Sequence, residues 1–431
     1  MAASALRERL LAHVQDIRIV DTHEHLVPEA DRVAQPADFF TWFAHYASSD
    51  LVSAGMSGDD LQFVRDSGKP LLERWQRLAP HWEHAKTTAY GRALIIAARE
   101  LYDVPEITGA TVEALSSRIA EANKPGLYRW VLKEKSGIDL SIIDVGTTDV
   151  DREFFAPMVR LDDFIGVTNR GALDGLERRT SVAIHSLDDL LRALDAAFDQ
   201  AVAGRAVGVK SGLAYSRILQ YDKVTRADAE RLFVRLFAGL GHGLSWSEAK
   251  SLQDFVMHEV VRRCIQYHLP MQIHTGLQEG NANIITNANP AHLTNLFLEY
   301  REARFDIFHG GYPYCRELAA LAKNFPNVYV DMSWLNVISP AVSRRMLDEW
   351  IETVPANKIF AFGGDYLFVE GVYAHQRLAR DVVSRVLSAK VEDGYLTEDE
   401  AHELAIKLLR TNPAKLYHLD LTADTKVEPN P

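Results

Sequence analysis

Short apolar runs alternate with longer stretches of helical spacing along most of the chain. The first run is IRIVDTH at 17–23, and seven more follow, at 140–146, 154–166, 206–215, 269–276, 304–311, 328–335 and 358–365. Between them lie amphipathic stretches such as SLDDLLRALDAAFDQAVAG, in which apolar residues recur at the spacing of a helix. Strands that alternate with helices predict a parallel sheet, and these eight match the count of a (β/α)8 barrel.

Residues 36 to about 135 interrupt this alternation. They are rich in Trp, Tyr, Leu and Ala at helical spacing and contain no clear strand. We therefore predict a single α/β domain over residues 1–431, with a long, mainly helical insertion at 36–135 after the first strand. Long insertions often shield the active site, so this one is expected to act as a cap or as a contact in a homo-oligomer.

Polar side chains gather at or near the carboxyl ends of the predicted strands. They are, in chain order, His23, His25, Lys210, His274, His309 and Asp365. In a TIM barrel these strand ends form one rim, whereas an open, doubly wound sheet would spread them along a line too long for them to meet. The first strand is also not followed by the GxGxxG of a dinucleotide-binding sheet. The pattern therefore favours the barrel.

The segment DTHEH at 21–25 carries the clearest chemical signal. Side chains two residues apart on a strand point to the same face, so His23 and His25 can direct both imidazoles at one point. Neutral imidazole is the commonest metal ligand in proteins. One such pair alone is more often a solvated strand end, but the further histidines and the aspartate at other strand ends favour a shared metal.

Composition and charge narrow the function. The 431 residues are 47% hydrophobic and carry a net charge of −12, which argues against a nucleic-acid or anionic-membrane surface but not against a small anionic substrate. The two cysteines, Cys264 and Cys315, fit a reducing compartment. The N-terminus lacks the apolar centre of a signal peptide, and no apolar run approaches the roughly 20 residues that span a bilayer. We expect a cytoplasmic protein.

The sequence contexts of these residues resemble a known group of enzymes. The pattern HxH, then HTG at 274–276, HGGYP at 309–313, GGD at 363–365 and the late TNPAKLY is similar to the amidohydrolase superfamily of metal-dependent TIM-barrel enzymes. Within it, the amidohydrolase-related ("amidohydrolase 2") branch is the most similar. The resemblance covers roughly 15–35 and 138–418. The long insertion, with its exit LYRWVLKEKSGID, also resembles uronate isomerases.

This resemblance implies a role for each rim residue. His23, His25, His274 and Asp365 would bind one divalent metal per chain, most simply Zn²⁺, and leave a position open for water. The metal would lower the pKa of that water from about 15.7 towards about 7. Asp365 would accept the proton of the water and return it to the leaving group. His309 would hydrogen-bond the hydroxide or polarise the substrate carbonyl.

Lys210 admits three interpretations. In dinuclear branches of the superfamily a lysine on strand four is carbamylated and bridges two metals, and His274 and His309 would then bind the second ion. An unmodified Lys210 would instead hold an anionic group of the substrate. The third interpretation is a lysine that reaches out of the apolar run and pairs with a carboxylate.

Further substrate contacts are expected near the same rim. Arg160 and Arg217 are suited to forked recognition of a carboxylate, Tyr215 follows Lys210, and Trp334 could form an apolar wall. Glu279 is either a rim residue or a polar contact to substrate. The insertion histidines His45, His81 and His84 lack the spacing of a metal site and are expected to be in packing or solvent contacts.

The leading functional hypothesis is a metal-dependent hydrolase that cleaves a C–N or C–O bond, such as an amide or ester, in a small anionic substrate. The alternatives on the same fold are a non-oxidative decarboxylase and a uronate isomerase. A barrel that binds metal without chemistry is a third possibility. Likeness of fold cannot choose among these reactions.

Overall fold

The structure is a computed structural model that describes residues 5–239 and 243–421. Its strands are all parallel to their neighbours. They are β1 Ile19–Glu24, β2 Ile138–Ile143, β3 Phe155–Pro157, β4 Val159–Arg160, β5 Val209–Ser211, β6 Met271–His274, β7 Phe305–Phe308, β8 Val328–Asp331 and β9 Ile359–Phe360. Only one residue separates β3 from β4, so the nine ranges fill the eight strand positions that the sequence predicts.

The strands follow one another in sequence order around the sheet. One ladder runs β1-β2-β3 and the other β4-β5-β6-β7-β8-β9. The two outer edges are also joined, because the N–H of Thr22 donates to the carbonyl of Phe362 at 3.3 Å and the N–H of Asp365 to that of His23 at 2.7 Å. This order and these bonds bring the first and last strands side by side, as the predicted barrel requires.

Helices cover the outside of the strands. They are α1 Ala5–Asp16, α8 Asp162–Ile165, α9 Arg170–Thr180, α10 Leu187–Ala203, α11 Arg226–Ala238, α12 Trp246–Gln266, α13 Thr294–Glu299, α14 Cys315–Asn324, α15 Leu335–Ile338, α16 Pro340–Thr353, α17 Val369–Glu392, α18 Glu398–Ile406 and α19 Asn412–Leu416. Several begin at side-chain caps, and Ser245 with Glu248 and Thr397 with Glu400 form full capping boxes. No helix in the part of the chain that is described combines the length and the apolar character needed to cross a membrane.

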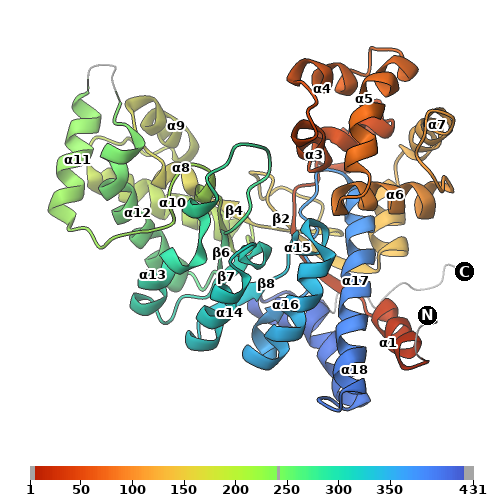
Figure 1. Cartoon of the computed structure of the whole chain (residues 1–431). Helices are drawn as coiled ribbons and strands as arrows, with labels where there is room; N and C mark the ends of the chain where they lie inside the picture. The colour runs from red at the N-terminus through yellow and green to blue at the C-terminus, as the bar shows by residue number, and fades with distance from the viewer. Residues whose placement is uncertain (1–4, 240–242, 422–431) are drawn as a thin grey trace, which may run out of the picture.

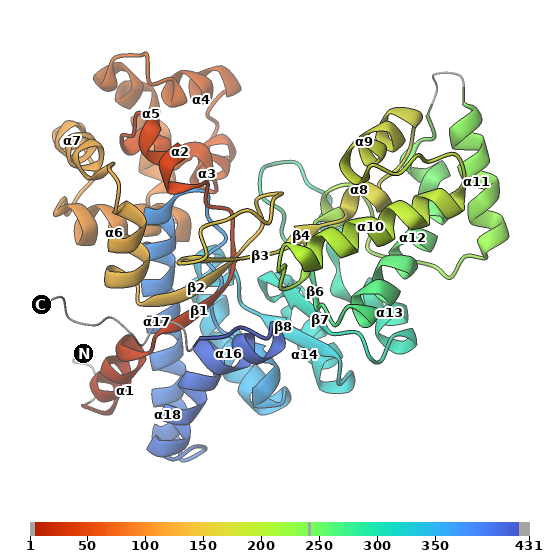
Figure 2. The same ribbon diagram turned by 180° about the vertical axis from the view of Figure 1, so that it is seen from behind.

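The insertion is helical, as predicted. It contains η1 Phe39–Ala44, α3 Ala47–Ser53, α4 Gly58–Arg65, α5 Leu71–Ala85, α6 Ala89–Tyr102, α7 Val112–Ala122 and η2 Arg129–Lys135, and the short helix α2 Glu29–Ala34 precedes it. Figures 1 and 2 show these helices beside α17, on the opposite side of the strands from α9 to α12. Trp42 stacks on Phe368 with ring centroids 6.2 Å apart, and the hydroxyl of Tyr373 donates to Glu100 at 2.9 Å. The insertion is therefore packed on the last strand–helix unit.

Two predicted strand runs end earlier than the sequence suggests. The run at 154–166 is extended only as far as Arg160, and α8 begins at Asp162. The run at 206–215 contains only β5 and then turns into η3 Leu213–Tyr215. In both cases apolar residues continue past the strand because the loop that follows it is itself buried. A run of apolar residues alone does not distinguish such a buried loop from a strand.

Candidate active site

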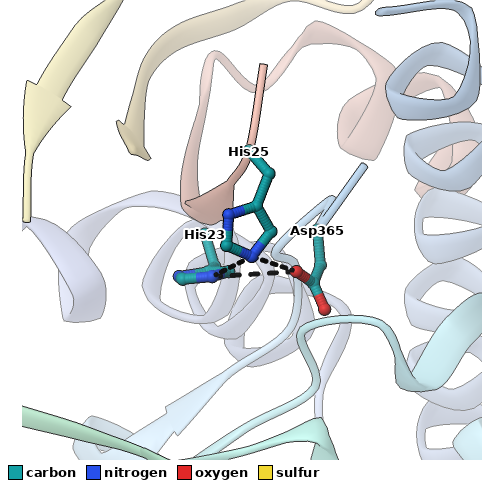
Figure 3. A group of neighbouring side chains, drawn as sticks. All are labelled: His23, His25 and Asp365. Carbon is teal, nitrogen blue, oxygen red and sulfur yellow. Dashed lines mark hydrogen bonds and ion pairs between the residues drawn. The ribbon is translucent and has the colours of Figure 1, made fainter. Parts of the chain in front are cut away.

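Three side chains from the joined edges of the sheet converge on one point. The Nε2 atoms of His23 and His25 lie 3.1 Å apart, and the Oδ1 atom of Asp365 lies 3.7 Å from the first and 3.3 Å from the second (Figure 3). His23 belongs to β1, His25 follows it directly, and Asp365 follows β9. The period of the strand and the hydrogen bond from Asp365 N–H to His23 together produce this convergence.

The surrounding backbone orients these donors. Nδ1 of His25 lies 2.7 Å from the carbonyl oxygen of Asp144, which assigns the ring proton to Nδ1 and leaves the lone pair of Nε2 facing the cluster. Asp365 has a φ of +57°, in the left-handed region, and the hydroxyl of Tyr46 donates to its carbonyl oxygen at 2.5 Å. A non-glycine residue held in this region is often found at functional sites.

The donor set fits a divalent cation. One ligand atom from each of His23, His25 and Asp365 lies within 4.8 Å of the other two. Zinc–ligand bonds of about 2.0–2.2 Å place neighbouring atoms of a tetrahedron about 3.3–3.5 Å apart, close to the observed separations. The Nδ1 atom of His23 is buried and has no hydrogen-bond partner among the described residues, whereas its Nε2 atom faces Nε2 of His25.

The protonation states also suit metal binding. Burial, reinforced by the charge of Lys210, lowers the pKa of His23 well below its usual range. Burial acts to raise the pKa of Asp365, but the hydrogen bond with His25 and the electrostatic influence of the neighbouring His23 and His309 rings hold it well below its usual range. Neutral imidazoles and an ionised carboxylate are the forms that bind metals.

A second pair of histidines lies next to this cluster. Nε2 of His309 is 2.9 Å from Nδ1 of His274 and 3.8 Å from Oδ2 of Asp365. The far nitrogen of His309 lies 3.0 Å from the carbonyl of Ser333, and that of His274 lies 2.8 Å from the carbonyl of Leu277. If His309 and His274 donate their ring protons to these two carbonyls, the lone pairs of Nε2 of His309 and Nδ1 of His274 face each other. A cation or a shared proton between the two nitrogens would satisfy both. His309 stands between His274 and Asp365, so His274 lies one ring away from the three-donor cluster.

Lys210 reaches the cluster from β5. Its Nζ is 3.3 Å from Nε2 of His23 and 3.8 Å from the centroid of the Phe308 ring. Burial lowers the pKa of Lys210 to about 8. Over residues 5–239 and 243–421 no carboxylate forms an ion pair with Lys210. The third interpretation, in which the lysine pairs with a carboxylate, therefore has no carboxylate to support it there. The cation and the carbamate remain predictions.

A cavity of about 360 Å³ opens above the cluster. It contains three of the predicted substrate contacts, Arg160, Lys210 and Tyr215. Its full lining is His25, His45, Tyr46, Arg160, Lys210, Gly212, Tyr215, His274, Glu279, Asp365 and Leu367. The guanidinium of Arg160 forms an ion pair with Asp144, the residue whose carbonyl orients His25. Arg160 is thus linked through Asp144 to His25.

Two predicted substrate contacts lie outside the lining of this cavity. Arg217 is buried, and its guanidinium bonds to Asp254, to Gln253 at 2.9 Å and to the carbonyl of Gln220 at 2.8 Å. These contacts give Arg217 a structural role in the interior of the protein. Trp334 is 1% exposed, and its φ of +63° turns the indole beneath the cavity, 4.5 Å from the stacked ring of Tyr46.

The insertion contributes two lining residues that the sequence analysis did not assign to the site. The rings of His45 and Tyr46 are in contact, tilted by 30° with their centroids 3.7 Å apart, and both residues line the cavity together with Asp365. Burial lowers the pKa of His45 to about 4, so the ring is neutral near neutral pH. The expectation that His45 is only a packing residue is therefore incomplete. No motif marks either residue, because their position depends on how the insertion packs.

Known proteins with similar sequences bear on this arrangement. The model of a family described as "Amidohydrolase" matches residues 182–419, more than half of the chain. The chain belongs to this amidohydrolase family. The expected resemblance to the superfamily and its amidohydrolase 2 branch is thereby confirmed. The protein fluG of Emericella nidulans is 32% identical over 242 residues, which cover 53% of this amidohydrolase but only 28% of fluG.

Other relatives match almost the whole amidohydrolase chain. The uronate isomerase of Phenylobacterium zucineum is 24% identical over 458 residues, covering 97% of this chain and 95% of its own. The crystal structure of uronate isomerase from Thermotoga maritima has a TM-score of 0.79 at 18% identity and covers 96% of this chain and 98% of its own. That of glucuronate isomerase from Caulobacter crescentus has a TM-score of 0.78 at 20% identity, with coverages of 97% and 95%. These likenesses confirm the fold.

Proposed function

We propose that this amidohydrolase-family chain is a metal-dependent isomerase that interconverts the aldose and ketose forms of a sugar acid of the hexuronate class. The observation that carries the proposal is the extent of the similarity to uronate isomerases, which covers 97% of this chain and 95% of the Phenylobacterium enzyme. Such coverage has to include most of the insertion that brings His45 and Tyr46 to the cavity. The isomerase thus replaces the hydrolase as our first choice.

The three-donor cluster would hold the metal. We propose one Zn²⁺ per chain on His23, His25 and Asp365, whose spacing supports that ion. Bound there, zinc would supply Lewis acidity and polarise the carbonyl and hydroxyl oxygens of the sugar. A second ion would require a carbamylated Lys210 and would take His274 and His309, whose facing nitrogens lie 2.9 Å apart.

Cations of the cavity wall would bind the acid group. Arg160 is partly exposed on the cavity side, with 43% of its side-chain surface accessible, and Lys210 has no competing carboxylate among the described residues. A guanidinium and an ammonium group are suited to bind a substrate carboxylate. Because Nζ of Lys210 lies 3.3 Å from Nε2 of His23, a substrate bound to these cations would lie directly against the metal donors.

The remaining residues would move protons. Isomerisation transfers one proton from the second carbon of the sugar to the first, and a second proton between the oxygens on these carbons. The ionised carboxylate of Asp365 would carry the proton between the carbons. His45 is neutral, so its ring can donate a proton to one oxygen and accept one from the other. Water is not consumed, and no electron acceptor is needed.

Hydrolysis remains a second candidate because the family model that matches residues 182–419 is that of amidohydrolases. The arrangement of His309 also supports it, since Nε2 lies 3.8 Å from Oδ2 of Asp365 and could hydrogen-bond an attacking water there. In that reaction Asp365 would accept the proton of the water and then protonate the leaving group.

We also propose that residues 1–431 act as one functional domain with 36–135 as its cap. The stacking of Trp42 on Phe368 across the two segments supports a cap fixed to the barrel. Cys264 and Cys315 are buried free thiols, which supports a reducing compartment such as the cytoplasm.

Product analysis tests the proposal. Zinc-loaded protein is incubated with D-glucuronate and D-galacturonate in deuterated water, and the products are followed by NMR. We expect the corresponding ketose, with solvent deuterium at the former carbonyl carbon to the extent that the proton exchanges on Asp365. Release of CO₂ would indicate a decarboxylase. Incorporation of heavy oxygen from labelled water into a cleaved amide or ester, with no uronate turnover, would establish the hydrolase instead.

A further inference from the structure

The cavity above the metal donors has two carboxylates in its wall. Asp365 belongs to the metal cluster, and Glu279, on the loop after β6, has no role in the reaction described so far. The same wall carries two cations, Arg160 and Lys210. An anionic substrate that is attracted by the cations therefore also meets a fixed negative charge.

The backbone of Glu279 is held in place. Its N–H donates to the hydroxyl of Tyr215 at 2.9 Å, and its carbonyl accepts a hydrogen bond from Asn283 at 3.0 Å. The neighbouring Gln278 donates to the carbonyl of Ala214 at 2.9 Å. The loop after β6 is thus fastened to the turn after β5, and Tyr215 and Arg160 line the same cavity as Glu279.

The carboxylate of Glu279 is available. Over the described ranges 5–239 and 243–421 it makes no side-chain hydrogen bond and no ion pair within 4.0 Å, although Arg65 of α4 influences it electrostatically. Its side chain is partly buried in the cavity wall. Neither carboxylate oxygen is fully buried, so both can be reached from the cavity, and an ionised carboxylate can accept hydrogen bonds from several donors.

The charged side chains of the cavity wall define the chemistry of the ligand. Arg160 and Lys210 select a carboxylate. Glu279 would repel a second carboxylate on the substrate and attract hydrogen-bond donors. In the uncharged part of the substrate these donors are hydroxyl groups. We propose that Glu279 is a specificity-determining residue that accepts hydrogen bonds from the hydroxyl-rich tail of a polyhydroxy monocarboxylate. This inference rests on the proposed function, since it names the part of the sugar acid that Glu279 recognises.

Binding of non-reacting acids tests the inference separately from catalysis. Metal-loaded wild-type protein, Glu279→Gln and the exposed control Glu302→Gln are titrated calorimetrically with D-gluconate, caproate and ε-aminocaproate. These acids carry a hydroxyl tail, an apolar tail and an ammonium tail. A hydrogen bond to a charged group is worth about a tenfold or larger change in affinity. We therefore expect wild type and Glu302→Gln to bind gluconate at least about tenfold more tightly than caproate.

In Glu279→Gln we expect this preference to fall to about twofold or less, with the affinity for caproate unchanged. Equal weakening of gluconate and caproate would overturn the inference, as would a wild-type preference for ε-aminocaproate over gluconate. Arg65→Gln distinguishes recognition from fastening. If Glu279 only ties the loop to α4, Arg65→Gln would reproduce the loss, which would also overturn the inference.

Failure of the proposed reaction would look different. If no uronate is isomerised but Glu279→Gln still removes the preference for gluconate, the isomerase proposal is wrong and the binding inference holds. If uronates are isomerised but the preference survives in Glu279→Gln, the isomerase proposal holds and Glu279 does not read the tail. Thermal unfolding of each variant confirms that the comparison is made between folded proteins.

Discussion

The barrel rim and the helical insertion contribute to the same cavity in different ways. On the rim, His23, His25 and Asp365 are placed by the strands that carry them, and their ligand atoms lie within 4.8 Å of one another. The insertion places His45 and Tyr46 through packing, with Tyr46 stacked on Trp334 at 4.5 Å. The difference teaches that a strand register can be read from a sequence, whereas a tertiary contact of an insertion cannot.

Removal of the metal should have the largest effect and should separate the two regions. Dialysis against a chelator is expected to abolish turnover, because the donors of the rim then have no ion to hold. Binding of an ion at about a thousandfold its dissociation constant stabilises the fold by about 4 kcal/mol, so the unfolding temperature should also fall. Activity and thermal unfolding are measured before and after reloading with Zn²⁺. Full turnover by a metal-free preparation would contradict the role given to the rim.

Asp365→Asn should have the next largest effect. It removes a donor of the cluster and the carboxylate that would carry the proton, while the side-chain volume is kept. Loss of a general acid–base typically costs about a hundred- to ten-thousandfold in rate, and kcat should fall within that range. Steady-state kinetics and metal content per chain are compared with Asp399→Asn, an exposed aspartate on α18. A kcat close to that of the control would exclude Asp365 from the reaction.

Tyr46→Phe tests the insertion with a smaller expected effect. The substitution removes the hydroxyl that donates to the carbonyl of Asp365 at 2.5 Å and leaves the aromatic stack in place. Loss of one such hydrogen bond costs about 1 kcal/mol or more, so we expect kcat to decrease about five- to twentyfold with metal content unchanged. The exposed Tyr395→Phe on the far loop provides the control. If metal is lost together with activity, the insertion also supports the donor cluster.

Acid stability tests α17, the helix on which the insertion packs. His375 is fully buried, Nδ1 lies 2.9 Å from the carbonyl of Gly364, and burial lowers its pKa to about 4. Because the unfolded chain, with a histidine pKa near 6.5, binds this proton more readily than the folded one, the free energy of unfolding should decrease as the pH falls from 6.5 to about 4. The full shift corresponds to about 3 kcal/mol.

This effect is measured by denaturant unfolding of the metal-free protein at several pH values. His375→Gln should give a flatter dependence over the same interval, because the amide does not titrate. His84, an exposed histidine of α5, gives the matched control in His84→Gln. Equal slopes for all three proteins would show that other buried groups dominate the acid response.

Much of the barrel and the convergence of His23, His25 and Asp365 could be predicted from the sequence. The two-residue spacing of His23 and His25 and the strand-end position of Asp365 depend on local structure, and the eight apolar runs correspond to the eight strand positions. Arg217 shows where this reasoning fails. Its proximity to Lys210 in the sequence suggested a substrate contact, but a non-local partner, Asp254 on α12, engages its guanidinium in the interior.

The positions of His309, Trp334 and Asp365 show a further limit. All three follow successive strands and have positive φ values, of 67°, 63° and 57°. Such a backbone turns the side chain away from the direction that strand alternation predicts. For this reason the order of the rim residues could be foreseen, but the placement of His309 between His274 and Asp365, and of Trp334 beneath the cavity, could not.

The hydrogen bond from Asp365 to His23 joins segments that lie near the two ends of the barrel sequence. A ribosome synthesises His23 and His25 early and Asp365 only after nearly all the other strands. An emerging chain therefore holds two imidazoles without their carboxylate partner and cannot assemble the complete cluster before its last strand has docked. Completion of the proposed metal site is thus a late event in the synthesis of this chain, and chains shortened before GGD would lack it.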